Sequence, residues 1–138
     1  DGGYHGDTVG AMSAGASSGY FSQWENLLFQ VTSLPYPETW ENDDEVEAKE
    51  AASLAALDQY LTDHGNETAA LIVEPLVQGA SGMRMCRPEF LTAVAARLKA
   101  ADILLIFDEV MTGFGRTGEI APAAELTVVA DRDDDRVI

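Results

Sequence analysis

The fold is decided by the stretch Ile103-Leu104-Leu105-Ile106-Phe107-Asp108-Glu109-Val110. Its first five residues form an apolar run rich in β-branched and aromatic side chains, which predicts a strand buried on both faces. In open α/β sheets, ligands bind just beyond the carboxyl ends of such strands. The carboxylates of Asp108 and Glu109 therefore follow the strand at a position where a functional site is expected.

A second strand is predicted upstream, over residues 69–73, with a helix between the two strands. Pro88 opens this helix at a position where proline is favoured. The apolar residues on its inner face are Leu91, Val94 and Leu98. Strands joined by such a crossover run parallel, so Glu74 and Asp108 are expected at the same edge of the sheet. The sequence thus predicts an α/β fold in which these two side chains share one site.

Another helix is predicted before the first strand. Asp44 and Glu47 have the spacing of a capping box, and the helix is expected to run to His64 and end at Gly65. Its apolar face carries Leu54, Leu57 and Leu61. The glycine-rich first thirty residues are predicted to be loop with short helical pieces, and residues 35–44 to be a surface connection.

The composition is strongly acidic, with 24 Asp plus Glu against 8 Lys plus Arg. Nucleic-acid and anionic-membrane binding are therefore not expected, because both depend on basic surfaces. The charge indicates either a solvated acidic surface or adaptation to high salt. A single cysteine, Cys86, rules out an internal disulfide and, with no recognisable signal peptide or membrane-length apolar run, favours the cytoplasm. With His5 and His64 as the two histidines, no metal cluster is expected.

Two nucleotide-binding motifs are partly matched. Apolar residues followed by Asp-Glu also occur in the magnesium-binding strand of phosphate-loop ATPases, but the phosphate loop requires a lysine after glycine, and neither Lys49 nor Lys99 follows one. Gly113, Gly115 and Gly118 have the spacing G-x-G-x-x-G. The dinucleotide fingerprint requires a tight turn directly after the strand, and five residues intervene here, so an accidental match is favoured.

Five motifs, in order along the chain, are shared with a known family. They are Tyr4-His5-Gly6-Asp7-Thr8, Gly10-Ala11-Met12-Ser13, Glu74-Pro75-Leu76-Val77-Gln78-Gly79-Ala80, Gly82-Met83-Arg84-Met85, and Asp108-Glu109-Val110-Met111-Thr112-Gly113-Phe114-Gly115-Arg116-Thr117-Gly118. Together they resemble the class III pyridoxal-phosphate-dependent aminotransferases. The resemblance implies part of the large domain of a fold-type I transferase, a mainly parallel sheet with flanking helices. Residues 1–125 are assigned to this partial cofactor-binding domain, and residues 126–138 to a divergent acidic tail.

The resemblance implies a role for three residues at the ring of pyridoxal 5'-phosphate. Asp108 would pair with the pyridine nitrogen and keep it protonated, so that the ring withdraws electrons from the substrate. Tyr4 would stack on one face of the ring, and Val110 would press on the other. Taken singly, these residues could equally be a strand-end acid, a loop aromatic and a packing residue; the combination of motifs favours the cofactor site.

Further positions in the matching motifs have supporting roles by the same resemblance. His5, Gly6 and Asp7 would shape the turn that presents Tyr4, and Glu74 would join a polar network beside the ring. For Glu74, a purely structural hydrogen-bonding role is an equal alternative. Arg116 is interpreted as a residue that ties loop to loop and is not expected to bind substrate.

Within the class, the Gly82–Met85 stretch and Met111 favour members that transfer an amino group from S-adenosylmethionine to 8-amino-7-oxononanoate in biotin synthesis. The partners implied are a small-molecule amino donor, a keto acceptor and a second copy in a homodimer. The alternatives are another class III aminotransferase that acts on an ω-amino acid, and a non-catalytic remnant or interaction module.

The resemblance is incomplete at the covalent anchor. Family members carry a Schiff-base lysine after Gly-Arg-Thr-Gly, whereas this chain has no lysine after Lys99, and so no catalytic residue is assigned. The family's upstream phosphate-binding loop and its downstream arginine for a substrate carboxylate are also not found. The chain, which begins at Asp1 without Met, is therefore expected to be an internal fragment or a frameshifted product that is inactive alone.

The charge excess predicts that salt stabilises the fold. Raising NaCl from about 0.1 M to about 1 M shortens the screening length from about 10 Å to about 3 Å and so weakens repulsion among the carboxylates. We expect the urea concentration at the unfolding midpoint to rise, as measured by circular dichroism. A midpoint that stays constant or falls would contradict this.

Overall fold

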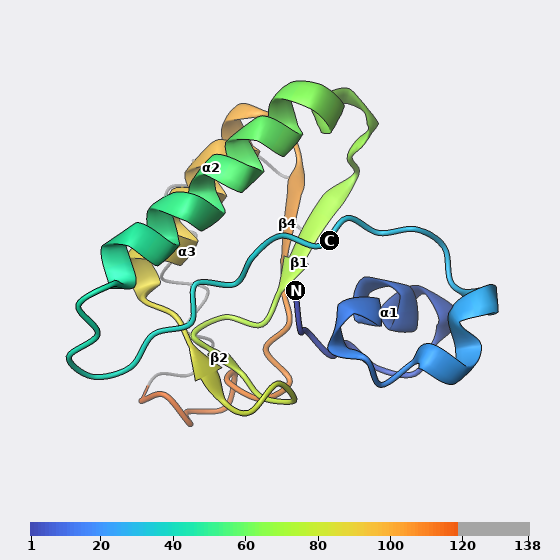
Figure 1. Cartoon of the computed structure of the whole chain (residues 1–138), viewed down its shortest axis with the longest axis horizontal. Helices are drawn as coiled ribbons and strands as arrows, with labels where there is room; N and C mark the ends of the chain where they lie inside the picture. The colour runs from blue at the N-terminus through green and yellow to red at the C-terminus, as the bar shows by residue number, and fades with distance from the viewer. Residues whose placement is uncertain (119–138) are drawn as a thin grey trace.

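The computed structural model of the protein describes residues 1–118, and Figure 1 shows their arrangement. The elements in chain order are α1 (Val9–Ala14), η1 (Ala16–Ser18), η2 (Ser22–Leu27), α2 (Val46–His64), η3 (Gly65–Glu67), β1 (Ala70–Val73), β2 (Val77–Gln78), β3 (Arg84–Met85), α3 (Pro88–Ala100) and β4 (Leu104–Phe107). The glycine-rich start forms short helical pieces joined by loop, as predicted. The divergent acidic tail, residues 126–138, lies outside the described residues.

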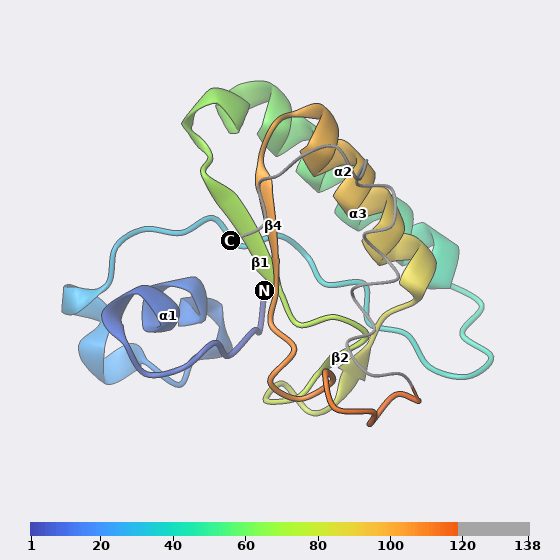
Figure 2. The same ribbon diagram turned by 180° about the vertical axis from the view of Figure 1, so that it is seen from behind.

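β1 and β4 form a parallel pair, which confirms the predicted α/β unit. In the register, Val73 is paired with Phe107, so the residues that follow, Glu74 and Asp108, leave the sheet at the same edge. Helices α2 and α3 lie side by side on one side of the two strands, and α1 lies on the other side (Figures 1 and 2). The N-terminus lies at the β2–β3 hairpin, where the side chains of Gln78 and Arg84 donate to the Asp1 carbonyl at 2.8 and 3.1 Å.

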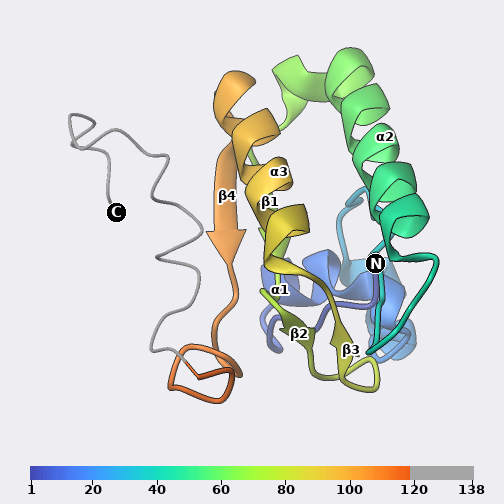
Figure 3. The same ribbon diagram turned by 90° about the vertical axis from the view of Figure 1, so that its left-hand side faces the viewer.

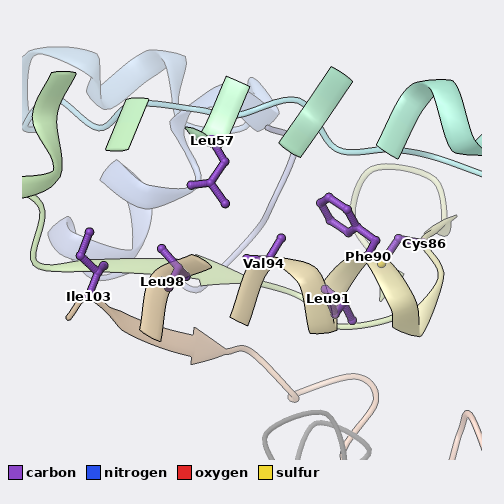
Figure 4. Packing of buried hydrophobic residues seen from close by; sticks show 7 residues of the cluster. All are labelled: Leu57, Cys86, Phe90, Leu91, Val94, Leu98 and Ile103. Carbon is purple, nitrogen blue, oxygen red and sulfur yellow. The ribbon is translucent and has the colours of Figure 1, made fainter. Parts of the chain in front are cut away.

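The core lies between the two long helices and the strands. Pro88 occupies the first turn of α3, Glu89 lies in the same turn, and Arg97 and Lys99 lie in the last turn, in agreement with the helix dipole. The predicted inner face of α3 is buried, and it packs with α2 around the side chains shown in Figure 4. The buried cluster comprises Leu57, Cys86, Phe90, Leu91, Val94, Leu98 and Ile103.

The capping box predicted for α2 is wrong. The helix begins at Val46, and its N-cap residue is Glu45, without a side-chain cap. The neighbouring Asp43 is buried instead. Its carboxylate accepts hydrogen bonds from the Glu45 N–H and from the Lys49 ammonium, 3.0 and 2.9 Å away. These local hydrogen bonds fix Asp43, while Asp44 remains exposed. The C-terminal boundary at His64 agrees with the prediction.

The expectation that the last strand is buried on both faces is also wrong for residues 1–118. Leu105 and Phe107 pack toward the helices, but Leu104 and Ile106, on the other face, are 67% and 45% exposed. Figure 3 shows both long helices on one side of the strands. The apolar run therefore contributes one face to the described core.

The segment between β1 and α3 contains structure that the sequence did not reveal. β2 and β3 pair as a short antiparallel hairpin, and Thr39 forms an isolated bridge to Met85. Residues 35–44 are accordingly not entirely superficial, since Pro37 and Asp43 are buried. No helix among residues 1–118 combines the length and apolar character needed to cross a bilayer.

The one-sided core predicts a contrast between two leucines. Leu98→Ala removes a side chain that is 1% exposed, and we expect the free energy of unfolding to fall by about 3 kcal/mol. Leu104→Ala makes the same chemical change at a position that is 67% exposed, and a change below about 0.5 kcal/mol is expected. Urea unfolding of both variants measures the difference. Equal losses would show that the outer face of β4 is packed.

Candidate functional site

The candidate site lies at the carboxyl ends of β1 and β4. The backbone N–H of Asp108 donates to the carbonyl of Val73 at 2.9 Å, which extends the parallel pairing by one step. Glu74, directly after Val73, is 6% exposed. The two carboxylates thus emerge beside each other at the edge where α/β sheets bind ligands.

Asp108 is fixed from two sides. One carboxylate oxygen lies 2.8 Å from His5 Nδ1, and the other accepts the Val110 N–H at 3.2 Å. Because an ionised carboxylate can only accept, Nδ1 of His5 carries the donated proton. The His5 and Asp108 side chains are 5% and 12% exposed, so this contact is shielded from water. The sequence assigned His5 to a turn and did not reveal the direct contact.

Gly3 makes room for the His5 ring. A Cβ atom built on Gly3 would lie 2.6 Å from Nε2 of His5, closer than nonbonded atoms approach. Gly6, by contrast, does not line the cavity described below, and its φ of 111° belongs to the turn that follows His5. Gly3 therefore makes space for the His5 ring, whereas Gly6 serves the backbone path.

Glu74 connects two loops to the sheet edge. Its carboxylate oxygens accept the backbone N–H of Tyr4 at 3.1 Å and that of Gly79 at 2.8 Å. A buried carboxylate needs such donors, because its desolvation would otherwise be costly. Glu74 therefore positions the main chain on both sides of the site.

The ring of Tyr4 is fixed by aromatic neighbours. Phe21, which is 4% exposed, stacks on it with ring centroids 5.4 Å apart, and Tyr20 meets it edge to face at 5.9 Å. The Tyr4 hydroxyl donates to Asp7, and this hydrogen bond raises the pKa of the phenol, which stays neutral. The sequence did not indicate Phe21 or Tyr20, since their contact with Tyr4 depends on the path of the intervening loop.

These residues surround a cavity of about 290 Å³. Glu74 and Asp108 form its acidic side, and Tyr4 provides an aromatic wall. The remaining wall is largely apolar and includes Ala80, Met83, Val110 and Met111.

Two of the apolar residues, Val110 and Met111, differ in how closely the protein surrounds them. Val110 is 91% exposed, so its side chain is free to meet a ligand. Met111 approaches Gly79 so closely that a Cβ on that glycine would lie 2.6 Å from the sulfur. Of the six residues predicted for the site, Tyr4, Glu74, Asp108 and Val110 line the cavity, His5 supports Asp108 from behind, and Gly6 lies away from it.

Comparisons with known proteins agree on one family. Residues 1–132 match the family described as aminotransferase class-III. Over 118 residues the chain is 63% identical to an adenosylmethionine-8-amino-7-oxononanoate aminotransferase from Synechococcus elongatus, which covers 86% of this chain and 27% of the relative. A protein of the same name from Mycobacterium leprae is 41% identical over 132 residues, covering 94% and 28%.

Solved structures give the same result. The adenosylmethionine-8-amino-7-oxononanoate aminotransferase of Methanocaldococcus jannaschii superposes with a TM-score of 0.72 and 34% identity, over 88% of this chain and 25% of that one. The lysine aminotransferase of M. tuberculosis superposes with a TM-score of 0.72 and 27% identity, over 91% and 29%. The chain thus spans about a quarter of the length of its relatives.

The two hydrogen bonds to Glu74 predict a local effect of its removal. Glu74→Ala leaves the Tyr4 and Gly79 N–H groups without their acceptor, and we expect the free energy of unfolding to fall by about 2 kcal/mol. Amide hydrogen exchange followed by NMR should accelerate at these two residues. Glu67→Ala, at a side chain that is 84% exposed, is the control and should change neither quantity. Unchanged exchange at Tyr4 in the Glu74 variant would contradict the assigned contact.

Proposed function

The chain belongs to the class III aminotransferases, pyridoxal-phosphate-dependent enzymes, and from this premise we propose that it forms part of the cofactor site of an enzyme that transfers an amino group from S-adenosylmethionine to 8-amino-7-oxononanoate. The observation that carries the proposal is the Asp108 carboxylate, fixed by His5 at the wall of the cavity. The names of the similar proteins from S. elongatus and M. leprae support the choice of substrates.

The residues present fit the ring of pyridoxal 5'-phosphate. A protonated pyridine nitrogen needs an anionic acceptor, and Asp108 supplies one that is largely shielded from solvent. A flat aromatic ring also needs apolar or aromatic surfaces beside its faces, and Tyr4 and Val110 line the same cavity. The cavity-lining residues within 1–118 include no Lys or Arg, so we assign the phosphate contacts and the covalent attachment to other parts of the protein.

The proposed mechanism gives each residue a task. When bound, pyridoxal phosphate supplies an electron sink for the bonds at the substrate's amino-bearing carbon. Asp108 would hold a proton on the pyridine nitrogen, because a nearby carboxylate favours the charged form of the base. His5, by donating Nδ1–H to Asp108, would keep the other side of that carboxylate oriented. Asp108 would thus maintain the positive charge on which the sink depends.

Tyr4 and Val110 would restrict the plane of the ring. Alignment of the bond to be broken with the ring system determines the rate, so a rigid wall lowers the cost of reaching the reactive geometry. Glu74 contributes indirectly, since it binds the backbone N–H of Tyr4. Phe21 completes the support through its stack on Tyr4.

The proposal extends to the rest of the protein. Residues 1–125 would be a portion of the large, cofactor-binding domain, and the complete enzyme would act as a homodimer on a small-molecule donor and acceptor. A cytoplasmic location is included, supported by the buried thiol of Cys86, which suits a reducing compartment.

The proposed role of Asp108 is tested in a protein in which this chain is joined to the flanking segments of a full-length class III relative. Asp108→Asn replaces an anion with a neutral amide that cannot stabilise the protonated ring. We expect single-turnover amino transfer from S-adenosylmethionine to slow by at least about a hundredfold, as for the loss of one preorganised electrostatic contact. Asp102→Asn, in the exposed turn before β4, is the control and should retain the parent rate.

Two results would change the proposal. A parent-like rate in the Asp108→Asn variant would refute the role of that carboxylate. A parent that prefers an ω-amino acid donor over S-adenosylmethionine would assign the chain to another member of the same class.

A further inference from the structure

Met83 adopts a conformation that is unfavourable in two respects. Its φ is 61°, in the left-handed region where a side chain with a Cβ is disfavoured and where glycine is the usual residue. Its side chain is also 59% exposed, so it gains little from burial of apolar surface. A glycine at this position would avoid the unfavourable backbone conformation. A polar residue would avoid the exposure of apolar surface.

The surrounding turn keeps Met83 in this conformation. The Met83 N–H donates to the Gly79 carbonyl at 3.3 Å, which closes the turn between β2 and β3. From outside, the Tyr20 hydroxyl donates to the Ala80 carbonyl at 2.9 Å. On the following residue, the Arg84 guanidinium makes two hydrogen bonds to Gln78 Oε1, at 2.9 and 2.6 Å. The turn is thus fixed at Ala80 and at Arg84 as well as by the backbone hydrogen bond of Met83 itself.

The position of Met83 relative to the cavity explains why the strain is tolerated. Met83 lines the cavity, as do Ala80, Val110 and Met111, on its apolar wall. Strained residues concentrate at ligand sites, where the conformation serves binding. A methionine side chain is flexible and polarisable, and it adapts to an apolar ligand of irregular shape. The exposed, apolar side chain of Met83 at this wall is therefore available for contact with an aliphatic part of a ligand.

We propose that Met83 is a specificity-determining residue whose side chain packs against the aliphatic chain of the amino acceptor, a long-chain oxo acid. This inference rests on the proposed function, because it takes the acceptor to enter the same cavity. Through this contact, Met83 discriminates between acceptors by the length of their chains.

Matched glycine substitutions in the 138-residue chain measure how much the left-handed conformation of Met83 costs in folding stability. Met83→Gly relieves the left-handed conformation and removes little buried surface, since Met83 is 59% exposed, so the urea midpoint should be equal to or higher than that of the parent. The control is Asp102→Gly, at an exposed residue with φ of 56° in the turn before β4, at the opposite end of that strand from the cavity. Because Asp tolerates this conformation better, its midpoint should gain less. A clear loss of stability in Met83→Gly alone would show that Met83 is a packing residue and would overturn the proposal.

Ligand contact is measured by NMR of the same chain labelled at the methionine methyl groups. The chain has four methionines, and Met85 serves as internal control, because it is 47% exposed and two residues from Met83 but does not line the cavity. On titration with 8-amino-7-oxononanoate, we expect the Met83 resonance to shift saturably and that of Met85 to stay in place. An acceptor analogue shortened by several methylenes should bind about tenfold more weakly, as should the full acceptor to Met83→Gly.

Met83→Leu should restore most of the affinity, because the aliphatic contact is retained. The proposal is overturned if Met83 does not shift, or if long and short acceptors bind equally. The two proposals can fail separately. If the Met83 resonance shifts as expected but a full-length protein that contains this chain takes no amino group from S-adenosylmethionine, the proposed function is contradicted and the role of Met83 is retained.

Discussion

The parallel pairing of β1 with β4 is the constraint on which the site depends. Because Val73 lies opposite Phe107, the residues that follow them, Glu74 and Asp108, leave the sheet at the same edge. Each of these two carboxylates then binds part of the N-terminal segment. Glu74 binds the Tyr4 backbone and Asp108 binds the His5 ring, so adjacent residues of one loop are fixed by adjacent strands. A slip of one residue would turn these side chains to opposite faces and separate the pair.

The charges at the site suit one part of the cofactor, the ring, and leave the phosphate to residues in the remainder of the protein. The described cavity is acidic on one side and apolar on the other, in a chain of formal net charge −16. Such a site suits a cationic ring, and a phosphate group needs cationic partners elsewhere. This agrees with a chain that spans about a quarter of its relatives and belongs to a family whose cofactor carries both a ring and a phosphate. The large domain would thus provide the ring site near Asp108.

The sequence predicted the features that depend on local periodicity and missed those that depend on tertiary contacts. Apolar runs located both long strands, and the spacing of Leu91, Val94 and Leu98 located α3 and its inner face. The shared edge of Glu74 and Asp108 followed from the parallel topology alone. The capping box failed because α2 begins at Val46 with Glu45 as its N-cap residue, and because the Glu45 N–H donates to Asp43 and not to Asp44. The β2–β3 hairpin was hidden by strands of two residues each in a glycine-containing loop. Phe21 and the His5–Asp108 contact required a loop path that no pattern encodes.

The central claim, that Asp108 keeps a bound pyridine ring protonated, is tested most directly by ¹⁵N NMR of ring-labelled pyridoxal 5'-phosphate in a full-length protein that contains this chain. The chemical shift of the ring nitrogen distinguishes the protonated from the neutral form without reference to turnover. We expect the protonated shift to persist to a pH well above that at which the free ring loses its proton, because the largely shielded carboxylate of Asp108 favours the charged form. A neutral ring nitrogen in the bound state at pH 7 would contradict the role assigned to Asp108.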